Sequence, residues 1–353
     1  MLPTLIAGLL YPWRAISGVP LDGLGSGEVR KFAHIFYLKP AVILLNVFPF
    51  CVFLILYVRF LSKYAKDDWV WLVGLVAGAW GTPLLVFNSV LNNHTVAAYS
   101  AFFALDAYLR IQDGGRSRVL FATVGFFGAF CACNELPAVL FAVILFLLMF
   151  QKSPSMTLRW FVPWSILPCA FFLATLYLAV GGLVPVYAEA GTEVYHYPGS
   201  FWNTPRGLEA LDEPRIIYLY NMLVGHHGVL SLTPIFLFSA VGVVRLWSRT
   251  GPLATLARLT ALLSLVVVLF YTFKTSNYGG ATQGMRWLLW LIPFWLLVLP
   301  WGLEPFRQDP GLRKVALAAL LISIFSVSYG LSMAWSHPWF LDLMKLCGVY
   351  EEV

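Results

Sequence analysis

Several polar residues that can bind a proton or a phosphate group stand at the ends of long apolar stretches in this sequence. Asn134-Glu135 places a carboxylate between two apolar runs, and Gly225-His226-His227-Gly228 places two imidazoles side by side. The other members of this polar set are Asn92, Asn93, His94, Lys274, Tyr278 and Arg286. Because buried polar groups are costly in a membrane, such residues usually have a function. Carboxylate and imidazole groups suit proton transfer, and basic groups suit an anionic leaving group.

Members of the set also have structural interpretations. Asn92 or Asn93 can cap the helix that begins near position 94, and Glu135 can be a solvated residue in a turn. Arg286 begins a span at the membrane interface, where basic side chains snorkel. With Lys274 and the glycines between them, it also forms a basic loop suited to a phosphate. On a helix the two adjacent histidines would point in different directions, so we assign no metal-ligating residue.

The composition is that of a membrane protein. The chain has 353 residues, of which 60% are hydrophobic and only 11% are charged, and its mean hydropathy is +0.78. Soluble domains are about half apolar and about a quarter charged, because charged side chains must cover their surface. The net charge of +6 fits basic cytoplasmic loops. We therefore expect a membrane lipid, and no nucleic acid, as a partner.

Ten apolar stretches are predicted to span the membrane, since about 20 residues in a helix cross its hydrocarbon core. Two of them are short and flank Asn134-Glu135-Leu136-Pro137, which reads as a turn because proline disfavours helix at the preceding residue. The sequence thus predicts an all-α polytopic membrane protein with about ten transmembrane helices. The predicted spans are 40–60, 69–91, 93–111, 118–133, 136–151, 158–181, 229–247, 254–273, 286–303 and 314–335.

The basic residues predict the orientation of these spans. Alternate short loops, five in all, contain fourteen of the 23 lysines and arginines. The positive-inside rule places these five loops in the cytoplasm. The loops on the other side contain all six histidines and the polar set described above. Any active site is therefore expected to face outward.

This orientation divides the chain into five segments. Residues 1–39 form an extracytoplasmic or interfacial segment, 40–181 transmembrane helices 1–6, 182–228 an extracytoplasmic loop, 229–335 transmembrane helices 7–10, and 336–353 an extracytoplasmic tail. The 182–228 loop combines aromatic residues with carboxylates, which suits sugar binding and equally an aromatic belt at the interface. The first span runs inward, although nothing before it would carry residues 1–39 across. We therefore expect a preceding helix that this sequence lacks.

Short motifs across nearly the whole chain resemble one known family. They are Thr82-Pro83-Leu84, Leu91-Asn92-Asn93-His94-Thr95, Asn134-Glu135-Leu136-Pro137, Gly225-His226-His227-Gly228 with Ser231-Leu232-Thr233-Pro234, Asn277-Tyr278-Gly279-Gly280 with Gly284-Met285-Arg286-Trp287, and His337-Pro338-Trp339. Together they resemble bacterial family-39-like glycosyltransferases of the GT-C superfold, which are similar to protein O-mannosyltransferases and lipid A aminoarabinose transferases. One departure is Met285, which replaces the proline of the family's Gly-Pro-Arg-Tyr run.

The resemblance implies a bacterial inner-membrane transferase whose donor is a polyprenyl-phosphate-linked sugar and whose site faces the periplasm. The family's general base is an aspartate in the first outer loop, before a Lys-Pro-Pro segment. Residues 2–8 resemble the stretch directly after that segment, so the first helix, the aspartate and the lysine are absent here. Asp22 and Glu28 remain in that loop, but neither matches the motif. No residue of this chain is therefore assigned as the catalytic base.

The resemblance also suggests roles for the polar set. Arg286, with Lys274, is expected to contact the lipid phosphate, and a divalent metal ion is an alternative partner for it. Asn93, His94 and Glu135 are expected to line the substrate cavity. The remaining candidate substrate-binding residues are Asn92, His226, His227 and Tyr278. Two other functions stay open: a transporter or flippase for a lipid-linked or small polar substrate, and a catalytically silent membrane subunit.

Overall fold

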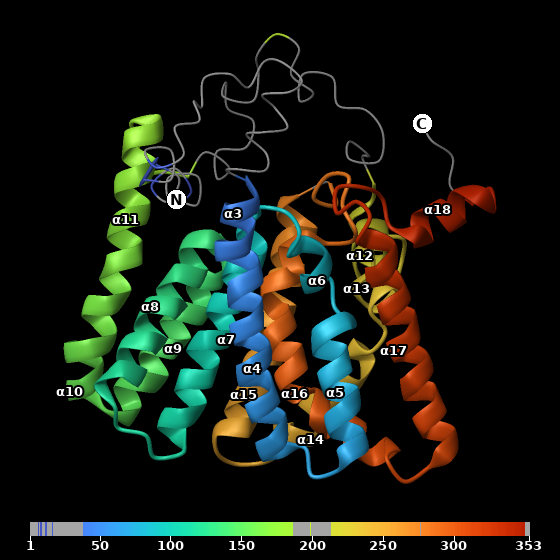
Figure 1. Cartoon of the computed structure of the whole chain (residues 1–353), viewed down its shortest axis with the longest axis horizontal. Coiled ribbons are helices and arrows are strands. Elements are labelled where there is room, and N and C mark those ends of the chain that lie inside the picture. Colours follow the sequence, from blue (N-terminus) through green and yellow to red (C-terminus); the bar gives the residue numbers. More distant parts are fainter. Residues whose placement is uncertain are drawn as a thin grey trace.

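The computed structural model describes residues 38–185, 213–275 and 277–349, together with the single positions 6, 8, 11, 12, 16 and 198. These residues form helices and loops without a β-strand (Figure 1). The predicted all-α fold is thus confirmed for this part of the chain. The predictions for most of 1–39, for most of 186–212 and for the last four residues fall outside it.

Helices occupy every range predicted as a span. Their bounds are α3 Lys39–Val42 with α4 Phe48–Tyr64, α5 Asp68–Trp80 with α6 Leu84–Phe87, α7 Asn93–Gln112, α8 Arg118–Asn134, α9 Val139–Lys152, α10 Pro154–Met156 with α11 Val162–Val180, α13 Val229–Leu232 with α14 Phe236–Trp247, α15 Pro252–Lys274, α16 Ile292–Leu303 and α17 Pro310–Gly330. Two further helices, α12 Arg215–Leu223 and α18 Trp339–Leu346, lie in segments predicted as loop and tail.

Six helical segments of the described residues are long and apolar enough to cross a membrane. They are Lys39–Tyr64, Asp68–Phe87, Pro154–Val180, Pro252–Lys274, Arg286–Phe306 and Pro310–Gly330. Three shorter apolar helices accompany them, Arg118–Asn134, Leu136–Lys152 and Phe236–Trp247. Their length and hydropathy are those of a helical membrane protein.

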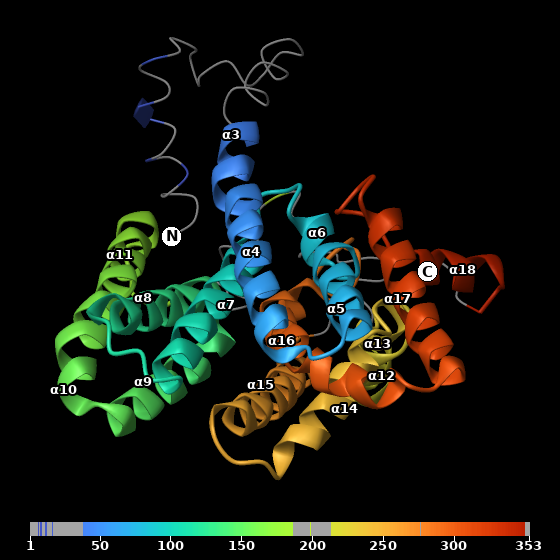
Figure 2. The same ribbon diagram turned by 60° about the horizontal axis from the view of Figure 1, so that its bottom comes forward.

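The bundle has a central helix and peripheral ones. In the segment Arg286–Phe306, which contains α16, 89% of the most apolar window is buried inside the protein, against 17% for Pro154–Val180, which contains α11. Figure 2 accordingly shows α16 among the other helices and α11 at the edge. The side chains that α11 leaves exposed are large and apolar, for example Ile166, Leu167 and Leu178. Such a surface suits contact with lipid chains.

Helices α14 and α16 pack with their backbones almost in contact. A Cβ atom built on Gly302 would lie 1.6 Å from the carbonyl oxygen of Phe238, and one on Gly242 would lie 2.1 Å from that of Val298. Only glycine fits at these positions without moving a backbone. Small residues at helix crossings are a common means of packing in membranes, where lipid offers no hydrophobic driving force for association.

The two ends of the bundle differ in chemistry. The turns after α4, α7, α14 and α16, which contain basic residues, lie at the bottom of Figure 1. Helices α3, α6, α12 and α18 lie at the opposite end. The polar candidate residues lie at helix ends and in the connecting turns at this second end, termed the polar end.

Candidate functional site

A buried carboxylate is the centre of the polar end. Glu135 follows α8 and is only 4% exposed, so the interpretation of a solvated turn residue is wrong. Its Oε1 atom hydrogen-bonds Nδ1 of His94 and accepts a bond of 3.1 Å from Nδ2 of Asn93. The hydroxyl of Tyr271 lies 3.5 Å from its Oε2 atom, at the long end of the hydrogen-bond range. One carboxylate therefore holds residues from α7 and α15 against the end of α8.

The two neighbouring asparagines have different roles at the start of α7. Asn92 caps the helix, because its Oδ1 atom accepts a bond of 2.8 Å from the amide of Thr95. Asn93 points across to the end of α8 and donates a bond of 2.7 Å to the carbonyl of Asn134. The capping interpretation is thus confirmed for Asn92. Asn93 belongs to the Glu135 cluster instead.

Two further residues of this region do not belong to the polar set predicted from the sequence. Asn46, in the π-helical turn Ile43–Val47, is fully buried and accepts a bond of 3.0 Å from the hydroxyl of Thr95. A lone asparagine inside an apolar span was the available signal, since polar groups at that depth are costly. Tyr271 gave no such signal, because an aromatic residue near a span end is common. Its ring stacks on Trp287, with centroids 4.9 Å apart.

A second polar cluster surrounds the two adjacent histidines. His226 and His227 are 0% and 1% exposed, and their Nδ1 atoms lie 2.5 Å apart. The expectation that they point in different directions is wrong, because they lie in the turn between α12 and α13 rather than on a helix. The ring of Tyr278 lies 4.8 Å from each imidazole centroid. Tyr278 in turn donates its hydroxyl to Glu213.

Burial keeps both histidines neutral at pH 7. Desolvation, with the nearby His337, lowers the pKa of His226 to about 4. The pKa of His227 falls well below its ordinary value through desolvation and through its two histidine neighbours. A bond between two Nδ1 atoms also needs one donor and one acceptor, so a second proton would break it. Burial and the Glu213 carboxylate raise the pKa of Tyr278, which keeps its hydroxyl as a donor.

Arg286 lies against Gly279, the residue that follows Tyr278 of the histidine cluster. Its guanidinium carbon is 5.2 Å from the centre of the Trp335 ring, and a Cβ atom on Gly279 would come within 3.1 Å of its Cγ and Nε atoms. Gly279 has a φ of +95°, in the region that favours glycine. The glycine-containing loop thus folds closely over the arginine. Lys274, the other predicted phosphate contact, is exposed at the end of α15.

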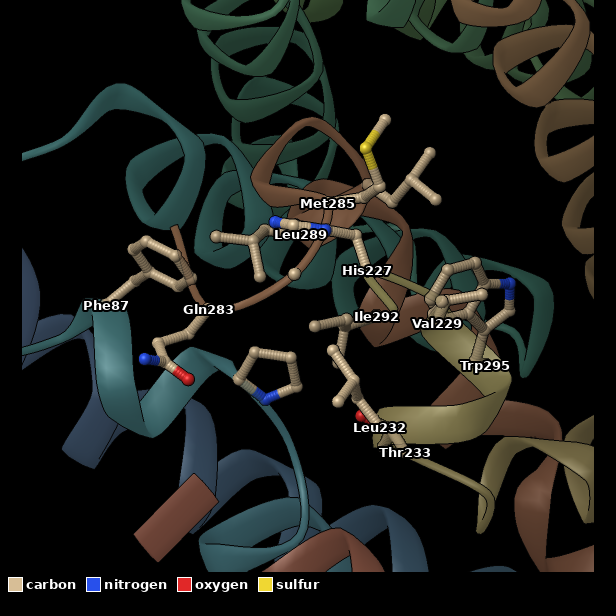
Figure 3. A pocket seen from close by; sticks show the side chains of 14 residues that line it. Phe87, His227, Val229, Leu232, Thr233, Gln283, Met285, Leu289, Ile292 and Trp295 are labelled. Carbon is tan, nitrogen blue, oxygen red and sulfur yellow. The ribbon is translucent and has the colours of Figure 1, made fainter. Parts of the chain in front are cut away.

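A small cavity of about 20 Å³, room for roughly one water molecule, is lined by His227. Figure 3 shows His227 and Gln283 at this cavity with apolar side chains that include Leu232, Leu289 and Ile292. Nε2 of His227 is buried and has no hydrogen-bond partner among the described residues. Gln283 is fixed by a bond of 2.6 Å to the hydroxyl of Ser336.

The structure therefore brings the candidate residues into two groups. Asn93, His94 and Glu135 form the first, and His226, His227, Tyr278 and Arg286 form the second. Among the described residues, no three histidines, cysteines or carboxylates are arranged to hold a metal ion. No protein-family model, curated protein or solved structure matches the chain.

Proposed function

We propose that this chain is a GT-C-like membrane glycosyltransferase that moves a sugar from a polyprenyl-phosphate donor to an acceptor outside the membrane. The observation that carries the proposal is the buried Glu135 carboxylate, bonded to His94 and Asn93 at the polar end of the bundle. Buried ionisable groups in membrane proteins mark functional sites. The motif resemblance supports the specific reaction.

The proposal includes an orientation and a location. All ten helical segments would cross the membrane. The shorter ones would span it where the bilayer thins locally around them. The basic turns would face the cytoplasm by the positive-inside rule. The polar end would then face the periplasm of a bacterial inner membrane, where lipid-linked donors and acceptors meet.

The chemistry requires an acceptor site and an anion site. The acceptor hydroxyl or amine attacks the anomeric carbon and releases its proton to water. The bond from that carbon to the phosphate oxygen breaks, and the phosphate keeps the electron pair. Glu135 and His94 would bind and orient the acceptor group, while Arg286 would stabilise the departing phosphate. Two groups of polar residues at one end of the bundle fit this division.

Reconstituted full-length protein tests the proposal. We expect transfer from a polyprenyl-phosphate sugar, with turnover reduced by about 10²–10³ in Arg286→Ala, the range for loss of one charge-stabilising donor. Arg118→Ala is the matched control, because Arg118 also stacks on a tryptophan, Trp160, at 5.4 Å. It lies at the start of α8, at the other end of the bundle.

Unchanged turnover in Arg286→Ala would show the phosphate role to be wrong. Vesicle uptake or lipid flipping without product would favour the transporter, and neither activity would favour a silent subunit. Because the polar groups gather at one end rather than at mid-membrane, the transferase is the better supported function.

A further inference from the structure

A second and larger cavity lies at the end of the bundle opposite the polar end. Its volume is about 90 Å³, room for several water molecules. The turn between α4 and α5 supplies Lys66 and Asp67, the turn after α14 supplies Arg249, and the end of α16 with the following turn supplies Trp301, Glu304 and Arg307. Three separate turns thus enclose a polar space.

The acidic residues of this cavity already have partners. Glu304 accepts a bond of 3.1 Å from the guanidinium of Arg245. Asp67 caps α5, because its side chain accepts from the amides of Trp69 at 3.0 Å and Val70 at 3.4 Å. Neither carboxylate depends on a cation that lines the cavity.

The cations of the cavity have no such partners. In the part of the chain that the structure describes, Lys66, Arg249 and Arg307 form no salt bridge. Like-charged side chains around one cavity repel each other, and an anion between them removes that repulsion. The three cations also outnumber the two carboxylates, Asp67 and Glu304, that line the cavity, so its net charge favours a negatively charged group.

The position of the cavity fits the level of lipid headgroups. It lies at the helix ends, next to Tyr64 and Trp301, whose ring centroids are 5.5 Å apart. Tyrosine and tryptophan are enriched at the membrane–water interface. Arginine and lysine bind phosphate oxygens through charge-assisted hydrogen bonds, and arginine does so in a bidentate fork.

We propose that this cavity binds a phosphate group, with Lys66, Arg249 and Arg307 as its ligands. The phosphate group belongs to an anionic phospholipid headgroup or to a free phosphate. The site is separate from the polar end, so the inference does not depend on the proposed transferase reaction.

Two binding measurements on the purified full-length protein distinguish these sources. Native mass spectrometry with phosphatidylglycerol reports headgroup binding, and thermal stabilisation by inorganic phosphate, against chloride at equal ionic strength, reports free phosphate. The test variant is Arg249→Gln with Arg307→Gln. The matched control is Arg116→Gln with Arg159→Gln, which removes two exposed arginines at the same end, one in the turn after α7 and one in the π-helical segment Thr157–Phe161.

Whichever probe the parent protein binds, phosphatidylglycerol or inorganic phosphate, we expect the test variant to bind it at least about tenfold more weakly. Each arginine supplies a charge-assisted hydrogen bond to the phosphate group. The control variant should bind within about twofold of the parent, and Lys66→Gln, a change in an exposed turn, gives a milder second test. Binding of phosphatidylglycerol alone identifies the headgroup, and stabilisation by phosphate alone identifies the free ion. Equal weakening in test and control variants, or no binding of either probe, would overturn the proposal.

Discussion

Nδ1 of His94 hydrogen-bonds Oε1 of Glu135, and this bond joins the first turn of α7 to the residue that follows α8. Both side chains are almost completely buried, at 8% and 5% exposure. The second carboxylate oxygen faces the Tyr271 hydroxyl near the C-terminal end of α15. A change of this carboxylate therefore tests both the chemistry of the site and the fixation of three helices.

Glu135→Gln should reduce turnover by about 10²-fold, because a change in the group that orients the acceptor misaligns it for attack. The amide keeps the size of the side chain and can still bond Asn93, so the thermal midpoint should change little. Turnover and thermal midpoint are measured on the same preparation. Asp106→Asn is the control, because it removes an acid that pairs with Arg110 at 2.7 Å, outside both polar clusters. Full turnover in Glu135→Gln would exclude a chemical role for this carboxylate.

The helices could be predicted closely from the sequence. The charged turns on either side of an apolar run mark where the helix begins and ends. For example, a helix was predicted at 254–273, and α15 lies at Pro252–Lys274. The break inside the predicted span 69–91 was missed. There α5 ends at Trp80 and α6 begins at Leu84, directly after Pro83. The proline was a usable signal, because it restricts the residue before it.

The contacts of the site could not be predicted in the same way. Tyr271 and Glu135 are 136 positions apart, and periodicity does not say which helix packs on which. The facing of His226 and His227 depends on the turn between α12 and α13, and the predicted loop at 182–228 carried no information on the path of that turn. Tertiary packing, rather than local preference, decides both arrangements. The sequence did indicate the end of the bundle at which these residues would gather.

Gly302→Ala should destabilise the protein strongly. The new methyl group would lie 1.6 Å from a backbone oxygen of Phe238, and a backbone atom cannot swing aside as a side chain does. We expect a loss at or above about 3 kcal/mol, the upper end for overpacking, seen as a lower thermal midpoint in detergent. Gly182→Ala is the control, since nothing lies within 4 Å of its Cβ position. Similar midpoints for the two variants would disprove the close crossing of α14 and α16.

Asn92→Ala and Asn93→Ala should have different effects although the residues are adjacent. Loss of the cap at Asn92 should cost about 1–2 kcal/mol of stability. Loss of Asn93 removes its bonds to Glu135 and to the carbonyl of Asn134, so it should lower turnover as well as stability, whereas Asn92→Ala should leave turnover nearly unchanged. Thermal midpoint and turnover, measured for both variants, separate the two roles. A reversal of the pattern would contradict the assignment of the cap and of the site contact.

The stability of the protein should fall as the pH is lowered from about 6.5 to about 4. Unfolded histidine has a pKa of about 6.5, whereas that of folded His226 is about 4 and that of His227 lies well below its ordinary value. Within this window the unfolded chain binds more protons than the folded protein. The contribution of the two histidines to the free energy of unfolding is therefore constant above the window and decreases as the pH falls through it. The slope should reach up to about 1.4 kcal/mol per pH unit for each histidine.

His227→Gln should make this pH dependence shallower, because it removes one buried imidazole and the Nδ1 partner of the other. Tyr278→Phe is the control: it keeps the ring that packs on both histidines and loses the hydroxyl, which bonds Glu213 and Asn221. The Tyr278→Phe variant should therefore lose stability with falling pH as steeply as the parent protein does. The measurement is the thermal midpoint in a series of buffers across the window. If His227→Gln and the parent show the same slope, acid sensitivity arises elsewhere, and the buried pair is not the group that titrates.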